Sequence, residues 1–163
     1  MNSLKSIKCG NYTLEFGKTI LMGVLNVTPD SFSDGGLFFS QKKAIGHAKQ
    51  MVKDGAQIID IGGESTRPYA SSVPDKEELR RIKNIIQALV QETNVPISID
   101  TCKPKVAEEC LKLGAHIVND VTGLRNKKMI EVVKKFSAPV VIMHMKGMPR
   151  TMQKNPKYKD AVN

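Results

Sequence analysis

Polar side chains follow several apolar runs of the sequence, at the points where predicted strands end. They are Asn26, Asp60, Glu64, Thr66, Arg67, Asp100, Asn119, Asp120 and His144. Most of them form hydrogen bonds, and few transfer protons. A carboxylate such as Asp100 facing an amide such as Asn119 suits a flat heterocycle with an amidine-like edge, because the carboxylate accepts from two N–H groups while the amide both donates and accepts. These residue types predict a site for a polar ring.

A phosphate-binding segment is predicted after the second of these runs. Thr66 and Arg67 follow Gly62 and Gly63, and an arginine can grip a phosphate with two parallel hydrogen bonds. Asn26 can complete the site through a Mg²⁺ ion that is held by phosphate oxygens and by only one or two protein groups. We therefore predict a Mg²⁺-dependent site for a phosphorylated small molecule.

The loop after the first apolar run has the composition of a binding lid. Residues 23–36 read GVLNVTPDSFSDGG, in which Pro29 fixes one backbone angle and the final glycines allow conformations that other residues avoid. Phe32 follows Ser31 as an isolated aromatic residue in a polar loop, where exposure is costly unless the ring covers a ligand or packs down.

Each strand-end residue also has a purely structural interpretation. Asn26 can simply shape a turn, as can Asn119 or Asp120. Asp100 can cap the following helix, although Thr101 can do so equally well. The sequence leaves these alternatives open.

Three further residues are weighed in the same way. Arg67 can be an ordinary surface charge. His144 is expected to hold a loop by hydrogen bonding rather than to take a proton. Met143 is at a strand end, where it can pack in the core or lie against a flat bound ring.

Five apolar runs, each followed by a polar loop, are the elements that must position these residues. The predicted strands cover residues 20–25, 57–61, 95–99, 115–118 and 139–143. Apolar residues at helical spacing lie between them, and a further helix is expected to begin at residue 157. A weakly alternating segment at about 4–17 contains the turn pair Gly10 and Asn11, which predicts a small β-hairpin before the main fold.

Alternation of strands and helices specifies an α/β fold with a parallel sheet. A doubly wound open sheet concentrates its ligand at one switch point, whereas every predicted strand here ends in a polar residue. This pattern is typical of a (β/α)8 TIM barrel, whose chemistry gathers at the carboxyl ends of all its strands. Such a barrel takes about 250 residues, so we expect residues 1–163 to be the first five βα units of a single, larger barrel domain.

Composition excludes several classes of protein. The net charge of +9 is spread along the chain and lacks interleaved aromatic residues, so we expect no nucleic-acid partner. The sequence has no apolar run long enough for a bilayer and no apolar leader segment, so a soluble, cytoplasmic protein is expected. Cys9, Cys102 and Cys110 have neither a paired count nor a C-x-x-C spacing, which argues against disulfides and a zinc site.

Five motifs together resemble the successive signatures of the dihydropteroate synthase family. They are GVLNVTPDSFSDGG at 23–36, DIGGESTRP at 60–68, SIDT at 98–101, IVNDVTG at 117–123 and MHMKGMPRTMQ at 143–153. The resemblance runs over nearly the whole chain in the family's order, and its first two motifs are highly specific. It implies a cytoplasmic barrel enzyme of folate biosynthesis, a homodimer at full length, that joins 7,8-dihydropterin-6-ylmethyl diphosphate to 4-aminobenzoate and releases diphosphate.

The resemblance also implies roles for individual residues. Asn26 lies on the Mg²⁺ ion and the diphosphate, and Asp100 and Asn119 hold the pterin ring. Thr66 and Arg67 meet the diphosphate and the second substrate. The lid contributes the substrate-binding residues Pro29, Ser31 and Phe32. Catalysis then consists mostly of neutralising the leaving group and positioning the amine.

Two departures from the family's pattern qualify these expectations. Tyr69 stands where the family usually has glycine. The family's later strands supply a further pterin-binding aspartate, a lysine and an anion-binding pair, so we expect residues 1–163 alone to be inactive. The alternatives are a pterin-binding methyltransferase domain, which lacks the lid and STRP motifs, and a non-catalytic anion-binding or assembly module.

Overall fold

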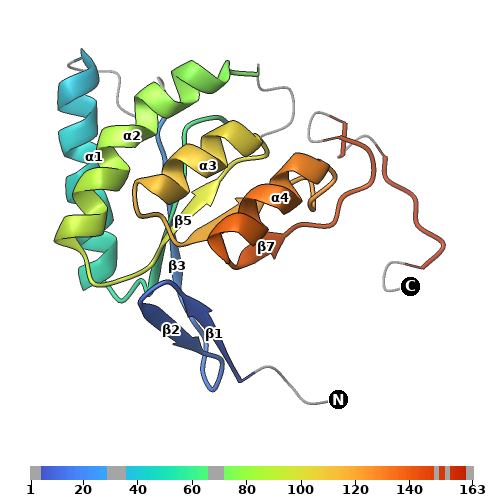
Figure 1. Cartoon of the computed structure of the whole chain (residues 1–163), viewed down its shortest axis with the longest axis horizontal. Coiled ribbons are helices and arrows are strands. Elements are labelled where there is room, and N and C mark those ends of the chain that lie inside the picture. Colours follow the sequence, from blue (N-terminus) through green and yellow to red (C-terminus); the bar gives the residue numbers. More distant parts are fainter. Residues whose placement is uncertain (1–4, 29–35, 66–71, 149–150, 153–154, 161–163) are drawn as a thin grey trace.

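The computed structural model describes residues 5–28, 36–65, 72–148, 151–152 and 155–160 (Figure 1). Its elements, in chain order, are β1 Ser6–Cys9, β2 Tyr12–Glu15, β3 Met22–Asn26, α1 Gly36–Lys53, β4 Ile58–Gly62, α2 Asp75–Glu92, β5 Ile97–Asp100, α3 Pro104–Lys112, β6 Ile117–Asp120, α4 Lys127–Phe136 and β7 Val140–Ile142. None of the described helices is both long enough and apolar enough to cross a membrane.

The main sheet has five parallel strands in the order β3-β4-β5-β6-β7. Each strand therefore pairs with its neighbours in sequence, whereas a doubly wound sheet reverses direction at a switch point. Sequential parallel pairing with intervening helices is the arrangement of a β/α barrel. The prediction of a partial TIM barrel is confirmed.

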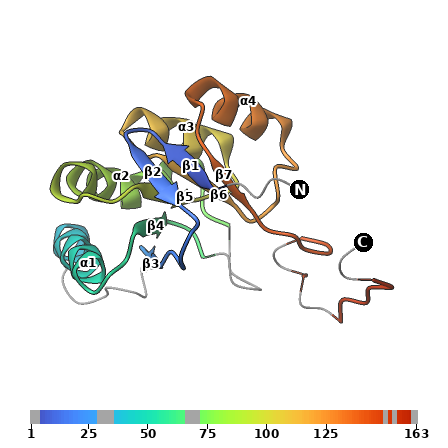
Figure 2. The ribbon, with the colours of Figure 1, turned by 90° about the horizontal axis from the view of Figure 1, so that it is seen from below.

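The helices cover one face of the sheet. Figure 2 shows α1, α2, α3 and α4 along an arc outside the strands. The strand residues that face them are fully or almost fully buried, among them Leu25, Ile61, Ile99 and Val118. They meet the apolar stripes of the helices, such as Ile82, Ile85, Ile86 and Leu89 of α2. This layer is the main core of the fold.

The other face of the sheet is arranged in rows set by the strand register. Nearest the amino ends, Met22 pairs with Ile58; the next row contains Val24, Asp60, Ser98 and Ile117; and the row at the carboxyl ends contains Asn26, Gly62, Asp100, Asn119 and Val141. Side chains alternate between faces along a strand, so these rows share one face. Val24 is 54% exposed and Val141 is 42% exposed, which leaves this face open at both sheet edges.

The antiparallel strands β1 and β2 pack against the amino-terminal part of that open face. Cys9 and Leu14 form a small apolar cluster with Ile58 and Ile117. Tyr12 stacks edge-on against the His116 ring, with 5.0 Å between ring centroids. The hairpin therefore covers one end of the sheet and leaves the carboxyl ends of the strands accessible.

Two details differ from the sequence-based expectations. Most observed strands end one or two residues later than predicted and so include Asn26, Gly62, Asp100 and Asp120, because the hydrogen-bonded ladder continues past the apolar run. No helix forms at residues 157–160, which are all exposed. A short segment that buries no apolar face gains too little to start a helix, so that prediction is wrong for the described residues.

Candidate active site

Three of the predicted site residues lie in one row across adjacent strands. Asn26 pairs with Gly62, Gly62 pairs with Asp100, and Asp100 pairs with Asn119. Gly62 has no side chain, so it leaves a space between its neighbours: a methyl group there would lie 3.5 Å from Asn26 Oδ1 and 3.5 Å from Asp100 Oδ2. Oxygen atoms from β3 and β5 therefore face the same space above β4.

Asp60 lies one row below and orients the amide of Asn119. Asn119 Nδ2 donates to Asp60 Oδ2 at 3.0 Å, which fixes the amide plane and leaves the amide oxygen and the second N–H of Asn119 for a ligand. Burial raises the pKa of Asp60, and interactions with Ser98 and Asn119 offset part of that rise. Within the described part of the chain, Asp60 Oδ1 and Ser98 Oγ are buried without a hydrogen bond of ordinary geometry. The polar groups one row nearer the amino ends of the strands thus form fewer hydrogen bonds than they are able to form.

Asp100 supplies the carboxyl group of this row. Burial, followed by the negative charges of Asp60, Glu78, Asp120 and Glu64, raises its pKa to about 7. A carboxylate in such surroundings gains from a ligand that brings N–H donors or positive charge. Asp100 is also not the cap of the next helix, because α3 has Lys103 at its N-cap position and Thr101 Oγ1 accepts from the Lys103 amide at 3.2 Å.

Asp120 has a different role from its neighbour Asn119. Its Oδ1 accepts from the amide and hydroxyl of Thr122 at 2.8 and 2.7 Å, and its Oδ2 accepts from the amide of Leu124 at 3.0 Å. Leu124 has a positive φ of 59°, a strained conformation for this residue type that these hydrogen bonds help to hold. Asp120 therefore shapes the β6–α4 loop, while Asn119 faces the open side of the sheet.

A charged cluster beside the row was not predicted from the sequence. The ammonium of Lys103 contacts Glu64 Oε2, the carbonyl oxygen of Val73, and Glu78 Oε2 at 2.6 Å. Glu78 is only 1% exposed. One signal could have revealed it: Glu78 occupies the apolar stripe of α2, four residues before Ile82, and a charged residue on a buried face needs a partner.

The second glycine of the GG pair holds the strand end close to α2. A methyl group on Gly63 would lie 2.9 Å from Glu78 Cγ and 2.9 Å from Ile82 Cγ2, distances that side chains do not tolerate without movement. Arg81 Nη1 also donates to the Gly63 carbonyl oxygen at 2.9 Å. Gly62 thus leaves room for a ligand, whereas Gly63 leaves room for a helix.

Several predicted site residues lie outside the described part of the chain, and two others directly follow β7. Those outside are Pro29, Ser31, Phe32, Thr66 and Arg67, together with Tyr69. Met143 directly follows β7 and is 36% exposed. The His144 ring, which is exposed, lies at a tilt to the Tyr158 ring with 5.7 Å between centroids.

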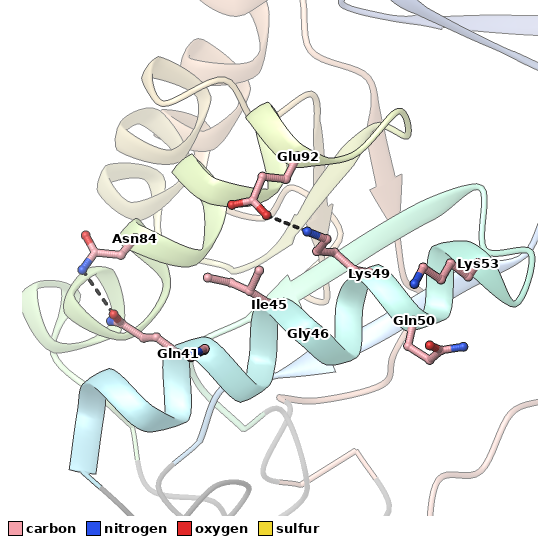
Figure 3. Close-up of a pocket in the computed structure, with 9 residues that line it drawn as sticks. Gln41, Ile45, Gly46, Lys49, Gln50, Lys53, Asn84 and Glu92 are labelled. Carbon is pink, nitrogen blue, oxygen red and sulfur yellow. Dashed lines mark hydrogen bonds and ion pairs between the residues drawn. The ribbon is translucent and has the colours of Figure 1, made fainter.

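A groove of about 620 Å³ lies away from this row, between α1 and α2 (Figure 3). Its lining residues are Gln41, Lys42, Ile45, Gly46, Lys49, Gln50, Lys53, Asn84 and Glu92. An ion pair between Lys49 and Glu92 at 2.8 Å spans it. None of the lining residues is a predicted site residue, so the groove is separate from the strand-end row.

Other features limit the chemistry of the described region. Its residues include no group of three or more histidine, cysteine, aspartate or glutamate side chains arranged to hold a metal ion. All three cysteines are free, with Cys9 and Cys110 buried.

The chain matches the family model described as pterin binding enzyme over residues 22–163. It is 49% identical over 149 residues to the dihydropteroate synthase of Escherichia coli K12, covering 91% of this chain and 53% of that protein. It is 50% identical over 155 residues to the dihydropteroate synthase of Synechocystis, covering 94% of this chain and 54% of that protein. The chain thus spans about half the length of these curated relatives.

Solved structures give the same result. The dihydropteroate synthase of Yersinia pestis, in complex with a sulfonamide drug, has a TM-score of 0.86 and 44% identity over 95% of this chain and 56% of that chain. The dihydropteroate synthase of Xanthomonas albilineans with 4-aminobenzoic acid has a TM-score of 0.86 and 42% identity over 96% of this chain and 55% of that chain. Sequence and structure therefore agree that the chain belongs to the family of pterin-binding enzymes.

Proposed function

We propose that the protein condenses 7,8-dihydropterin-6-ylmethyl diphosphate with 4-aminobenzoate, forming 7,8-dihydropteroate and diphosphate in folate biosynthesis. The observation that carries this proposal is the row of Asn26, Gly62, Asp100 and Asn119 at the carboxyl ends of adjacent strands. Relatives about 50% identical are dihydropteroate synthases, and structures of such enzymes contain 4-aminobenzoic acid or pteroic acid. The first ligand is the proposed second substrate, and the second is the oxidised form of the whole proposed product.

The pterin ring is proposed to bind against Asp100 and Asn119. The Asp100 carboxylate accepts hydrogen bonds from the amino and ring N–H groups of the pterin, which lowers its raised pKa in the bound state. The Asn119 amide is oriented by the hydrogen bond from its Nδ2 to Asp60, and its oxygen accepts a further hydrogen bond from the pterin. Both groups act by holding the ring in one plane, so that its methylene carbon is set for attack by the amine of the second substrate.

A Mg²⁺ ion fits the donor chemistry of this row. Asn26 Oδ1 faces the space over Gly62, and Mg²⁺ is usually bound through one or two protein oxygens together with substrate phosphates and water. When bound, Mg²⁺ would supply neutralisation of the negative charge that develops on the leaving diphosphate. We propose Asn26 as its protein ligand.

Other substrate contacts are proposed from the family's motifs. Thr66 and Arg67 meet the diphosphate and 4-aminobenzoate, and Pro29, Ser31 and Phe32 cover the site. Met143 lies against the pterin ring. We further propose that the protein is cytoplasmic, that residues 1–163 belong to one barrel domain, and that the complete enzyme is a homodimer.

The proposal can be tested by completing the barrel. Residues 1–163 joined to the remaining part of the Escherichia coli relative, aligned by their 49% identity, are expected to form dihydropteroate when Mg²⁺ and both substrates are supplied. Residues 1–163 alone are expected to bind pteroic acid weakly and to give no turnover. The chimera with Asn119→Ala should lose at least about 100-fold in kcat/KM, the usual scale for a lost positioning contact.

Two controls make the result interpretable. Circular dichroism and the unfolding midpoint establish that each chimera is folded. Methyl transfer from a methylated folate, assayed on the same chimera, tests the methyltransferase alternative. A folded chimera that binds neither pterin nor 4-aminobenzoate would contradict the proposed function.

A further inference from the structure

One lysine joins three separate parts of the chain beside the strand-end row. Lys103 immediately precedes α3, and its ammonium contacts Glu64 in the β4–α2 connection, Glu78 in the first turns of α2 and the carbonyl oxygen of Val73. Glu64 and Val73 lie near the two described ends of that connection. We call Lys103, these two carboxylates and this carbonyl the Lys103 clasp.

The clasp is largely withdrawn from solvent. The side chains of Lys103, Glu64 and Glu78 are 16%, 21% and 1% exposed. Glu78 Oε1 has no hydrogen-bond partner among the described residues. Removing one partner from a buried ion pair is strongly destabilising because the other charge is left uncompensated, so Lys103 is needed wherever these two carboxylates are ionised.

The clasp is connected to the row through the backbone as well as through charge. The Lys103 amide donates to Thr101 Oγ1 at 3.2 Å, and the Thr101 amide donates to the carbonyl oxygen of Asn119 at 3.1 Å. The charged groups that act on Asp100 are Glu78 and Glu64 from the clasp, and Asp60 and Asp120 from the neighbouring strands. Lys103 supplies the positive charge that faces the first two.

We propose that Lys103 is a positioning residue, which ties the two described ends of the β4–α2 connection, at Glu64 and Val73, to the start of α3 and thereby holds the end of β4 and the first turn of α2 in place beside Asp100. The inference rests on the proposed function only in taking the strand-end row as the ligand site. The clasp acts without contacting the ligand: it fixes where the connection leaves and rejoins the fold, and it balances two carboxylates behind Asp100.

Amide hydrogen exchange in the full 163-residue chain tests the mechanical part. In Lys103→Met, exchange in residues 62–65 and 72–78 is expected to rise at least tenfold relative to α4. Lys103→Arg keeps the charge and is expected to restore most of the protection. Lys105→Met is the matched control, because Lys105 is exposed and only two residues away. The double variant Lys103→Met/Glu78→Gln removes the buried Glu78 carboxylate together with the lysine. It is expected to keep α2 packed and can therefore be measured if Lys103→Met alone unfolds.

Titration of Asp100 by carboxyl-carbon NMR distinguishes the loss of the Lys103 charge from a general loss of structure. With Lys103→Met, the unbalanced charges of Glu64 and Glu78 are expected to move the Asp100 pKa upward by about half a pH unit or more. Unfolding would instead move it down toward the ordinary value of 3.8. Unchanged exchange in both the single and the double variant, or an unchanged Asp100 titration in folded Lys103→Met, would overturn the proposal.

A parallel titration of the wild-type chain with pteroic acid keeps the two proposals apart. If the exchange and the Asp100 titration change as expected, the clasp is supported whether or not pteroic acid binds. Failure of pteroic acid to bind the completed chimera counts against the proposed function alone.

Discussion

The two ends of the sheet are built on different principles. At the amino end, Cys9 and Leu14 of the hairpin pack on Ile58 and Ile117, and all four are buried. At the carboxyl end, the row is polar, Asn26 is exposed, and burial together with neighbouring negative charge raises the pKa of Asp100 to about 7. One end is closed by apolar contact, and the other remains open with groups held in an unfavourable environment.

This difference indicates where stability and binding come from. Apolar burial at the amino end contributes roughly 25 cal/mol for each Å² removed from water. The carboxyl end gives up stability, because burial and neighbouring carboxylates raise the pKa of Asp100, and burial raises the pKa of Asp60 despite its interactions with Ser98 and Asn119. Such groups are the ones a complementary ligand can satisfy.

The largest expected effect comes from Asp100→Asn at the carboxyl end. Because the folded-state pKa of Asp100 is raised to about 7 from 3.8, its contribution to stability is complete below pH 3.8 and is lost as the pH rises toward 7. Asparagine does not titrate. The free energy of unfolding of the variant, compared with that of wild type, should therefore rise by at most about 4 kcal/mol as the pH is raised from 4 to 8. Urea unfolding at both pH values measures the gain. An equal difference at pH 4 and pH 8 would contradict the comparison.

Ile58→Ala tests the amino end. Ile58 is 7% exposed, and truncating such a residue should cost about 3 kcal/mol through lost burial and the cavity left behind. The affinity of the completed barrel for pteroic acid should remain within about twofold of wild type. Leu21→Ala is the control, because Leu21 is 54% exposed and should cost little. A large fall in pteroic acid affinity with Ile58→Ala would show that the two ends are not independent.

Substitution of the adjacent glycines sharpens the contrast within one strand end. Gly63→Ala should destabilise the fold by about 2 kcal/mol, because the new methyl group meets Glu78 and Ile82 at 2.9 Å. Gly62→Ala makes only ordinary contacts of 3.5 Å, so stability should change by less than about 1 kcal/mol. Its methyl group nevertheless enters the space between Asn26 and Asp100, and pteroic acid affinity should fall at least tenfold. Isothermal titration calorimetry measures the affinity of each variant for pteroic acid, and urea midpoints measure its stability. Equal losses of affinity and of stability in Gly62→Ala and Gly63→Ala would contradict the different roles of the two glycines.

The smallest effect is expected at His116, near the hairpin. Its Nδ1 accepts from the amide of Ile97 at 3.1 Å, and burial lowers its pKa below 6.5. Its stabilising contribution is therefore present above pH 6.5 and is lost as the pH falls through the lowered value. His116→Gln should reduce the stability difference between pH 7.5 and pH 5.5 by less than about 1 kcal/mol. Thermal unfolding of both proteins at the two pH values measures this difference. A larger difference in the variant than in wild type would contradict the prediction.

The sequence predicted the architecture well because its signals are local. Apolar runs ended by polar loops located every strand of the parallel sheet, and the polar strand ends favoured a barrel over a doubly wound sheet. Most strand ends were placed one or two residues too early: Asn26, Gly62 and Asp100 lie within their strands, because the hydrogen-bonded ladder continues past the last apolar residue. The family resemblance assigned the pterin ring to Asn119, whereas the residues alone left Asn119 and Asp120 both open as turn formers, because the two faces of a strand are told apart only once its register is known.

The Lys103 clasp shows a second limit of sequence-based reasoning. Glu64, Val73, Glu78 and Lys103 come from three segments, and nothing in local periodicity joins them. Only the charge on the apolar stripe of α2 marked Glu78 as unusual. The predicted lid residues and the Thr66–Arg67 pair remain predictions, because they lie outside the described residues.

The sequential strand order has a consequence for how the chain acquires its structure during synthesis. Because β4, β5, β6 and β7 each pair with the strand made just before them, every new unit can dock on an edge that already exists when it leaves the ribosome. Loop closure then spans one helix at a time, which keeps its entropic cost low. Growth by successive addition is thus possible from β3 onward, with each newly made edge exposed until the next strand pairs with it.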